Sequence, residues 1–360
     1  MEATAAVAGL SYDCPFDFIS GADRKCKFLY ILSVLVLKYA DRKGDGGFMK
    51  KFIRNLAVFI VCLSCLLFAY CELALAASVK YRGENTKQQI VRSFENASAG
   101  DFNCYFMGNS RIYRGINPDL FTGVKAYNFS HDNDSYNQMY YKLLFLEKKD
   151  KKIDYLVIGT DYFQFSVYGD SRNYIYDRLF GLDYMKDYND SVVDEIFSDI
   201  MYFWKTKRDC LQFCIPYLKG EPAGDKINYM KDNGQYVVYG VATEADTVER
   251  YAFIREIQKE YFVKIVKYCE SNDIELYVIM PPTRDEELAS YTQEEMDAID
   301  QMIEESLGER FRGNYFNCSD LPAFKHYSNY TDITHLNAEA ADRFSEYLNE
   351  AIPLQGEQHG

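Results

Sequence analysis

The chain has 360 residues and a formal net charge of −14. This acidity excludes a nucleic-acid-binding class, because phosphate binding requires clustered Lys and Arg. A hydrophobic content of 48% is enough for the core of one large α/β domain or two small ones. The five cysteines after residue 100 contain no CxxC pair, so neither a zinc site nor a dense disulfide framework is expected.

The N-terminal region contains a segment that predicts membrane attachment. Residues 56–71 are continuously apolar, and the stretch is about long enough to span a bilayer. Basic residues stay in the cytoplasm, and three of them precede this run: Lys50, Lys51 and Arg54. We therefore expect residues 49–77 to be a single-pass signal anchor in the cell membrane, with the rest of the chain outside the cytoplasm. A cleaved signal is the alternative, because residues 74–76 resemble a signal-peptidase site.

Residues 1–48 differ from a targeting segment. Their apolar run, FLYILSVLVL, is too short to span a membrane comfortably. The tripeptide that begins at Met49 resembles the start of a signal sequence. The codons for residues 45–48 can include GGAGG, a bacterial ribosome-binding site. We expect translation to begin at Met49 and residues 1–48 to be a translated leader, with a genuine N-terminal extension as the alternative.

After a polar segment at 78–100, which is expected to be a stalk, strand-like and helix-like segments alternate. The expected strands are Asp101–Met107, Lys125–Phe129, Asp154–Gly159, Glu275–Met280 and Asn314–Cys318. The expected helices are Ser135–Lys149, Glu249–Glu270, one capped by Thr292 and Glu295, and Ala338–Ile352. This alternation predicts an α/β domain over 101–352 with a parallel sheet covered on both faces. Residues 165–248 interrupt it and are expected to form an inserted helical cap.

Ser110 directly follows the first expected strand, in FMGNSRIYRGINPDLF. Such a position lies at the carboxyl edge of a parallel sheet, where ligands bind. The chain turns there into a helix, and backbone N–H groups at the turn can serve an oxyanion. Gly108 allows a tight turn. Ser110 is therefore a candidate nucleophile.

A nucleophilic serine needs a base, and the base needs an orienting acid. The chain has only four histidines. His335 lies in YTDITHLN, just before the last expected helix, and Asp332 precedes it by three residues in a loop. The spacing allows the carboxylate to reach the imidazole and hold its tautomer. We therefore predict a triad of Ser110, His335 and Asp332, against the alternative of a surface loop with an incidental histidine.

These two segments resemble the first and last sequence blocks of the SGNH (GDSL-like) hydrolases. The pattern GNSR, GINPDLF, AYN, MYY and DYLVIG is similar to that of DltD-like acyl-transfer proteins outside the cytoplasm and of proteins that O-acetylate exported polysaccharides. The resemblance covers roughly residues 101–350. It implies a three-layer, flavodoxin-like fold, a Ser-His-Asp mechanism and a partner of the membrane-bound O-acyltransferase family.

The middle blocks depart from the SGNH pattern. A Gly whose N–H serves the oxyanion hole normally occupies the second block, where this chain has Ser130. The third block normally carries an Asn donor, but here Asp161 stands in its place, and an ionised carboxylate repels an oxyanion. Asn109 or Asn133 is the candidate substitute donor.

Other polar residues near these blocks suggest binding roles. The segment His131–Asp134 could suggest a metal, but no second cluster at ligand spacing accompanies it, so an exposed polar loop and no metal or cofactor are expected. Arg111 and Arg114 are candidates for binding a phosphate or carboxylate of an acceptor polymer, and solvated surface arginines are the alternative.

Together these features predict acyl transfer through an ester on Ser110 to a hydroxyl of a glycan or teichoic-acid-like wall polymer. Two alternatives stay open. One is a secreted esterase that transfers the acyl group to water. The other is a non-catalytic SGNH-like scaffold of a membrane acyltransferase complex, which the weak oxyanion elements favour.

Overall fold

The structure, a computed structural model, describes residues 47–169, 172–181, 183–184, 213–223, 228–244, 250 and 252–354. The chain divides into two compact units, which we describe separately. The first is Met1–Ala77 with Asp209–Lys219, and the second is Ser78–Arg208 with Gly220–Gly360. Residues 1–46 of the expected leader lie outside the described residues.

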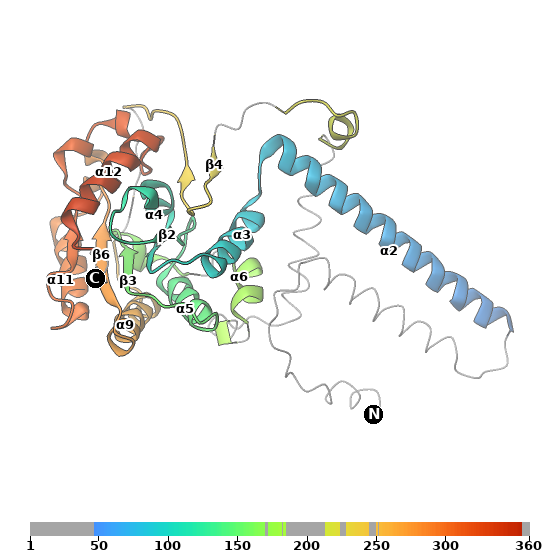
Figure 1. Cartoon of the computed structure of the whole chain (residues 1–360), viewed down its shortest axis with the longest axis horizontal. Coiled ribbons are helices and arrows are strands. Elements are labelled where there is room, and N and C mark those ends of the chain that lie inside the picture. The colour runs from blue at the N-terminus through green and yellow to red at the C-terminus, as the bar shows by residue number, and fades with distance from the viewer. Residues whose placement is uncertain are drawn as a thin grey trace. The chain divides into compact units, whose positions relative to one another are not determined.

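A five-stranded parallel sheet forms the centre of the second unit (Figure 1). Its strands are β1 (Cys104–Met107), β2 (Ala126–Asn128), β3 (Tyr155–Gly159), β6 (Glu275–Met280) and β7 (Tyr315–Asn317). They lie in the order β2-β1-β3-β6-β7. Counted along the chain this is 2-1-3-4-5, the flavodoxin-like order, whose switch point falls between β1 and β3.

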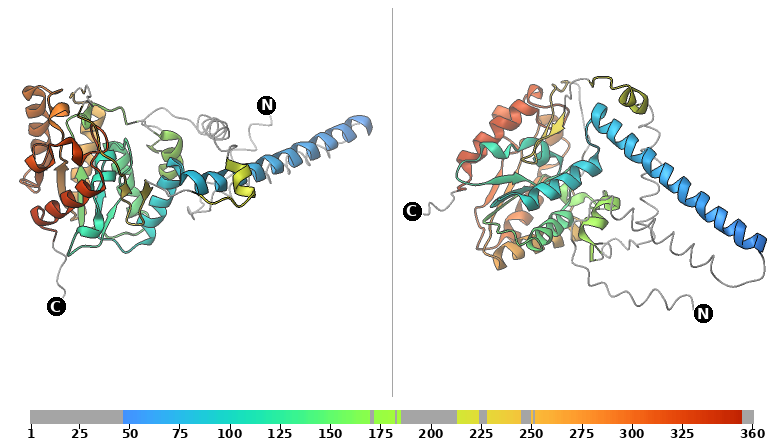
Figure 2. Two further views of the ribbon diagram at one scale, coloured as in Figure 1. Left: turned by 90° about the horizontal axis from the view of Figure 1, so that it is seen from above. Right: turned by 45° about the vertical axis from the view of Figure 1, so that its right-hand side comes forward.

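Helices cover both faces of this sheet (Figure 1, Figure 2). One face carries α3 (Thr86–Ala99), α5 (Tyr136–Glu147), α9 (Glu256–Ser271) and α11 (Gln293–Leu307). The other carries α4 (Ser110–Gly115) and α12 (Ala338–Ala351). The three-layer α/β fold is therefore confirmed. The capping box of Thr292 and Glu295 begins α11, as the sequence predicts.

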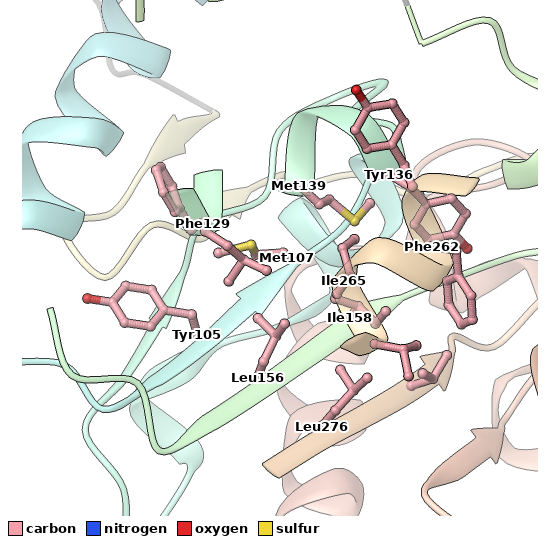
Figure 3. Packing of buried hydrophobic residues seen from close by; sticks show 14 of the residues in the cluster. Tyr105, Met107, Phe129, Tyr136, Met139, Leu156, Ile158, Phe262, Ile265 and Leu276 are labelled. Carbon is pink, nitrogen blue, oxygen red and sulfur yellow. The ribbon is translucent and has the colours of Figure 1, made fainter. Parts of the chain in front are cut away.

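The strands contribute side chains to two hydrophobic cores, one on each face of the sheet, because successive side chains point to opposite faces. Figure 3 shows Met107, Ile158 and Leu276, from three adjacent strands, packing with Met139 of α5 and Ile265 of α9. All five side chains are fully buried, and each such burial stabilises the fold by roughly 1.5–3 kcal/mol. The intervening strand residues Phe106, Val157 and Ile279 belong to the second core, beside α12.

The expected stalk at 78–100 is wrong for its second half, because α3 packs on the sheet. Its residues Ile90, Phe94 and Ala97 recur every three or four positions and are fully buried. The Phe94 ring lies edge-on to Phe129 with centroids 4.7 Å apart. The segment is polar overall because its other residues are mostly half-buried or exposed, and three apolar residues are enough to dock it.

The described part of the expected cap at 165–248 is only partly helical. It contains α6 (Asn173–Phe180), a helix at 213–218 and a hairpin of β4 (Tyr229–Met230) and β5 (Tyr236–Val237). In α6, Ile175, Tyr176 and Phe180 join the core. Most of the remaining cap, including Trp204, lies outside the described residues.

The first unit contains most of helix α2 (Gly47–Arg82) and the helix at 213–218. Cys214 of the short helix is buried against Ala74 and Ala77 of α2. Several large apolar side chains of α2 are exposed, among them Phe52, Leu56, Phe59, Leu63 and Leu66. Within the described residues, no helix combines the length and apolarity that crossing a membrane requires.

Candidate active site

Ser110 is the first residue of α4, directly above the carboxyl end of β1. Asn109 caps this helix, and its Oδ1 accepts a hydrogen bond of 2.9 Å from the Arg111 backbone N–H. Two glycines at the strand ends allow α4 to pack this closely. A Cβ on Gly108 would lie 2.4 Å from Ile112 Cγ1, and one on Gly159 would lie 1.9 Å from the same atom.

His335 and Asp332 lie in the loop before α12, which backbone bonds hold in place. Asp332 Oδ1 accepts the backbone N–H groups of Thr334 at 2.8 Å and His335 at 2.9 Å. The N–H of Thr331 donates to the carbonyl of His335 at 2.8 Å. This loop geometry turns the imidazole toward α4.

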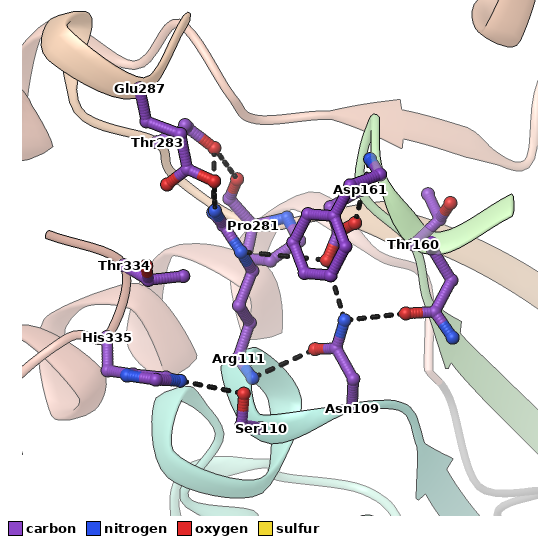
Figure 4. A network of polar contacts seen from close by, with 12 residues as sticks. Asn109, Ser110, Arg111, Thr160, Asp161, Pro281, Thr283, Glu287, Thr334 and His335 are labelled. Carbon is purple, nitrogen blue, oxygen red and sulfur yellow. Dashed lines mark hydrogen bonds and ion pairs between the residues drawn. The ribbon is translucent and has the colours of Figure 1, made fainter. Parts of the chain in front are cut away.

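The three predicted residues meet as a continuous chain of hydrogen bonds. His335 Nε2 lies 2.7 Å from Ser110 Oγ (Figure 4), and Nδ1 lies 2.8 Å from Asp332 Oδ2. An ionised carboxylate only accepts, so Nδ1 carries the proton and Nε2 accepts the Ser110 hydroxyl. The arrangement is that of a nucleophile, a base and an orienting acid.

The protonation states suit these positions. Burial lowers the pKa of His335 below its ordinary value, and the Asp332 hydrogen bond offsets this only in part, because the charges of Arg114 and Arg111 lower it further. Burial would raise the pKa of Asp332, but the His335 hydrogen bond and two backbone N–H groups hold it well below its usual range. At neutral pH the imidazole is therefore neutral and the carboxylate ionised.

Arg111 points away from solvent into a buried charge network (Figure 4). Its Nη1 donates to Thr283 Oγ1 at 2.9 Å, its Nη2 forms an ion pair with Glu287, and its Nε lies 3.6 Å from Asp161 Oδ2. The expected role of Arg111 in binding a polymer anion is therefore not supported, because protein carboxylates already occupy its guanidinium.

Asp161 follows β3, at the switch point next to Ser110. Burial raises its pKa, while Arg111 and a hydrogen bond from Asn109 act in the opposite direction. Its Oδ1 also accepts the Phe163 backbone N–H at 3.1 Å. The net shift of the Asp161 pKa is upward, because burial and the nearby Glu287 carboxylate disfavour its ionised form. Arg111 attracts that ionised form and offsets the charge that would otherwise repel an oxyanion.

The expected oxyanion donors are mostly engaged elsewhere. Asn109 Nδ2 donates to Asp161 Oδ2 and Gln164 Oε1, both at 2.6 Å. The Ser130 N–H donates to Asn128 Oδ1 at 3.1 Å. Asn133 is exposed, in a left-handed conformation with φ 60°. Among the described residues, the Ser110 N–H donates no backbone hydrogen bond, so this group is available to an oxyanion.

In the loop at 131–134, the side chains of His131 and Asp134 are buried within the protein. Asp134 is buried and pairs with Lys142, and Tyr176 donates to its other oxygen at 2.5 Å. His131 is buried edge-on to the Tyr113 ring, so the expected exposure of this loop is wrong for both residues. In the part of the chain that the structure describes, no group of three His, Cys, Asp or Glu side chains converges as metal ligands would.

A broad groove lies at the opposite edge of the sheet, near the amino ends of β1, β3 and β6. Its lining includes Asp101, Asn103, Lys125, Asp154 and Glu275, and none of the triad residues. Four of its charged lining residues pair with one another, Lys125 with Asp101 and Lys152 with Asp154. We therefore place the candidate active site at the triad, on chemical grounds.

Sequence reasoning missed Thr283, Glu287 and Gln164, which surround Arg111 and Asn109. All three follow carboxyl ends of strands, Gln164 after β3 and the others after β6. Inspection of each strand end for polar residues would have found them. No family model matches this chain, and no curated protein is similar to it in sequence.

Proposed function

We propose that this chain is an acyl-transfer protein of the SGNH type that forms an acyl ester on Ser110. The observation that supports it is the unbroken contact from Ser110 Oγ through His335 to Asp332, at 2.7 and 2.8 Å. Its place at the switch point of a parallel sheet is where such folds bind ligands.

In the first half-reaction, Ser110 Oγ attacks the carbonyl carbon of the acyl donor, and its proton passes to His335 Nε2. The bond from the carbonyl carbon to the donor oxygen breaks, and His335 gives the proton to that leaving oxygen. Asp332 stabilises the transient imidazolium. The Ser110 N–H faces the developing oxyanion.

In the second half-reaction, a hydroxyl of the acceptor attacks the acyl ester. His335 takes its proton and returns it to Ser110 Oγ as the bond between the acyl carbon and that oxygen breaks. We propose a wall polymer or exported glycan as acceptor and a membrane-bound O-acyltransferase as the partner that supplies the donor. The proposed location is outside the cytoplasmic membrane, tethered by residues 49–77.

Two competing functions use the same geometry differently. A secreted esterase would transfer the acyl group from Ser110 to water. One specific observation favours a non-catalytic scaffold. The Asn109 side-chain amide and the Ser130 backbone N–H already donate hydrogen bonds to protein acceptors, so they do not serve an oxyanion hole. The following two experiments separate these functions.

The first experiment tests the nucleophile. A serine-directed fluorophosphonate should label the full-length protein, and Ser110→Ala and His335→Ala should each abolish labelling, because loss of a triad member costs several orders of magnitude in rate. The matched control is His326→Ala, since that ring is exposed and, within the described residues, hydrogen-bonds to Ser328 and lies beside the Tyr327 ring. Wild-type labelling of Ser110→Ala would place the nucleophile elsewhere.

The second experiment tests transfer in cells. Deletion of the gene should lower the ester-linked acyl content of purified envelope polymers, and the wild-type gene but not Ser110→Ala should restore it. Full restoration by Ser110→Ala would support the scaffold. Rapid hydrolysis of many small aryl esters by the purified protein, with unchanged polymer acylation, would support the esterase.

A further inference from the structure

Glu287, in the short helix α10 (Asp285–Leu288), is a fully buried carboxylate between two arginines. Arg111 Nη2 forms an ion pair with Glu287 Oε1, and Arg250 Nε lies 3.5 Å from the same oxygen. The ring of Phe163 covers both guanidinium groups, at 5.8 Å from Arg111 Cζ and 4.4 Å from Arg250 Cζ.

Each arginine connects Glu287 to one member of the triad. Arg111 is the residue after Ser110 in α4. Arg250 Nη2 donates to Thr334 Oγ1 at 3.4 Å, and Thr334 precedes His335. A line of charges thus runs from the helix of the nucleophile through Glu287 to the loop of the base, although these three segments lie far apart in the sequence.

This arrangement is a poor device for stability alone. Taking charges out of water is costly, and a buried ion pair often stabilises a fold no better than apolar side chains would. Neither Glu287 oxygen receives a well-aligned hydrogen bond within the described part of the chain, although the Arg111 contact is close enough for an ion pair. Glu287 is held chiefly by the charges of its two arginines.

We infer that Glu287 is a positioning residue of this site. Through Arg111 and Arg250 it holds Ser110 and His335 at the correct relative position, and its negative charge offsets the positive charge of the two arginines near the imidazole. The inference rests on the proposed function. The charged groups that face His335 are Asp332 from its own loop and Arg111 and Arg114 from α4.

Asp161 and Glu287 lie behind Arg111 and balance it, and Arg250 reaches the His335 loop through Thr334. Loss of the Glu287 charge leaves a larger positive potential near His335, which disfavours the imidazolium. Loss of the Arg250 charge has the opposite effect. The two substitutions should therefore move the pKa of His335 in opposite directions.

The experiment measures the fluorophosphonate labelling rate of the full-length protein in detergent as a function of pH. Glu287→Gln should lower the plateau rate on the order of 10- to 100-fold, as small misplacements of reacting groups do, and move the midpoint of the acid limb to lower pH. Arg250→Gln should also lower the rate but move the midpoint to higher pH. Asp285→Asn is the matched control, an exposed carboxylate of the same helix paired with Lys325.

Opposite midpoint shifts with slower labelling support the inference. A lower rate in both variants without those shifts would reduce Glu287 to a structural role and overturn it, as would wild-type behaviour of both. Should Glu287→Gln not fold, the Arg250→Gln midpoint decides alone, because its side chain is partly exposed. Absence of labelling in the wild type, or its persistence in Ser110→Ala, would instead refute the proposed function.

Discussion

At the scale of single residues, the protonation state of His335 decides in the proposed mechanism whether Ser110 can react. A general base must be neutral before it takes a proton. Burial and the neighbouring arginines lower the pKa of this imidazole, while Asp332 raises it. Since the net shift is downward from 6.5, labelling of Ser110 should persist on the acid side of that value.

Arg114 offers a direct test of this electrostatic balance. Arg114 lies about one helical turn after Ser110 in α4. Its guanidinium is 3.0 Å from Asp132 Oδ1, and its charge lowers the pKa of His335. In Arg114→Gln that charge is gone, so the pKa of His335 should rise and the acid limb of labelling should move to higher pH. The measurement is the labelling rate against pH.

Arg310→Gln provides the control, because Arg310 pairs with Asp273 on an exposed surface away from the triad. Its profile should match that of the wild type. An unchanged midpoint in Arg114→Gln, or a shift to lower pH, would contradict the electrostatic account of His335.

At the scale of secondary-structure elements, the placement of Ser110 depends on how closely α4 approaches β1 and β3. Ile112, one residue past Arg111, packs against both Gly108 and Gly159. Any side chain at either glycine would displace the helix whose first residue is Ser110, the proposed nucleophile. The two strand ends and the helix thus act as one unit that aims Ser110 at His335.

Gly159→Ala should therefore both destabilise the protein and slow its chemistry. The added Cβ would lie 1.9 Å from Ile112 Cγ1, and overpacking of this kind typically costs about 1–3 kcal/mol of unfolding free energy. Displacement of α4 should also reduce the labelling rate of Ser110. Denaturant unfolding and labelling kinetics measure the two effects.

Gly115→Ala is the matched control in the same helix, since its nearest neighbour, Leu336 Cδ1, would lie at an ordinary 3.6 Å. It should leave both quantities close to those of the wild type. Equal effects of the two substitutions would mean that the packing of Ile112 does not govern the position of Ser110.

At the scale of the whole molecule, the proposed function depends on where the second unit resides. Lys50, Lys51 and Arg54 precede the apolar run, and basic residues stay on the cytoplasmic side. Protease added to intact spheroplasts should therefore digest residues 78–360. A cytoplasmic protein in the same cells serves as the control for intact membranes. Complete protection of the second unit would reject the extracytoplasmic placement.

The sequence by itself determined the layered fold and pointed to the three residues that the structure brings together as a chain of hydrogen bonds. Each of these features has a local signature. Strands such as DYLVIG are short apolar runs, their helices have helical spacing, and Asp332 lies three residues from His335, so the carboxylate reaches the imidazole within one loop. The position of Ser110 at a strand end was enough to place it at the edge where ligands bind.

Only the tertiary structure decided which partners the charged residues have. The contact between Ser110 and His335 joins residues 225 positions apart. The sequence predicted Arg111 as a ligand for a polymer anion, with a solvated surface arginine as the alternative, yet its side chain is buried and paired with Glu287 after β6 and Asp161 after β3. The polar segment at 86–99 likewise belongs to the core, because Ile90 and Phe94 meet the sheet. Burial depends on the packing of distant elements, which local sequence patterns do not encode.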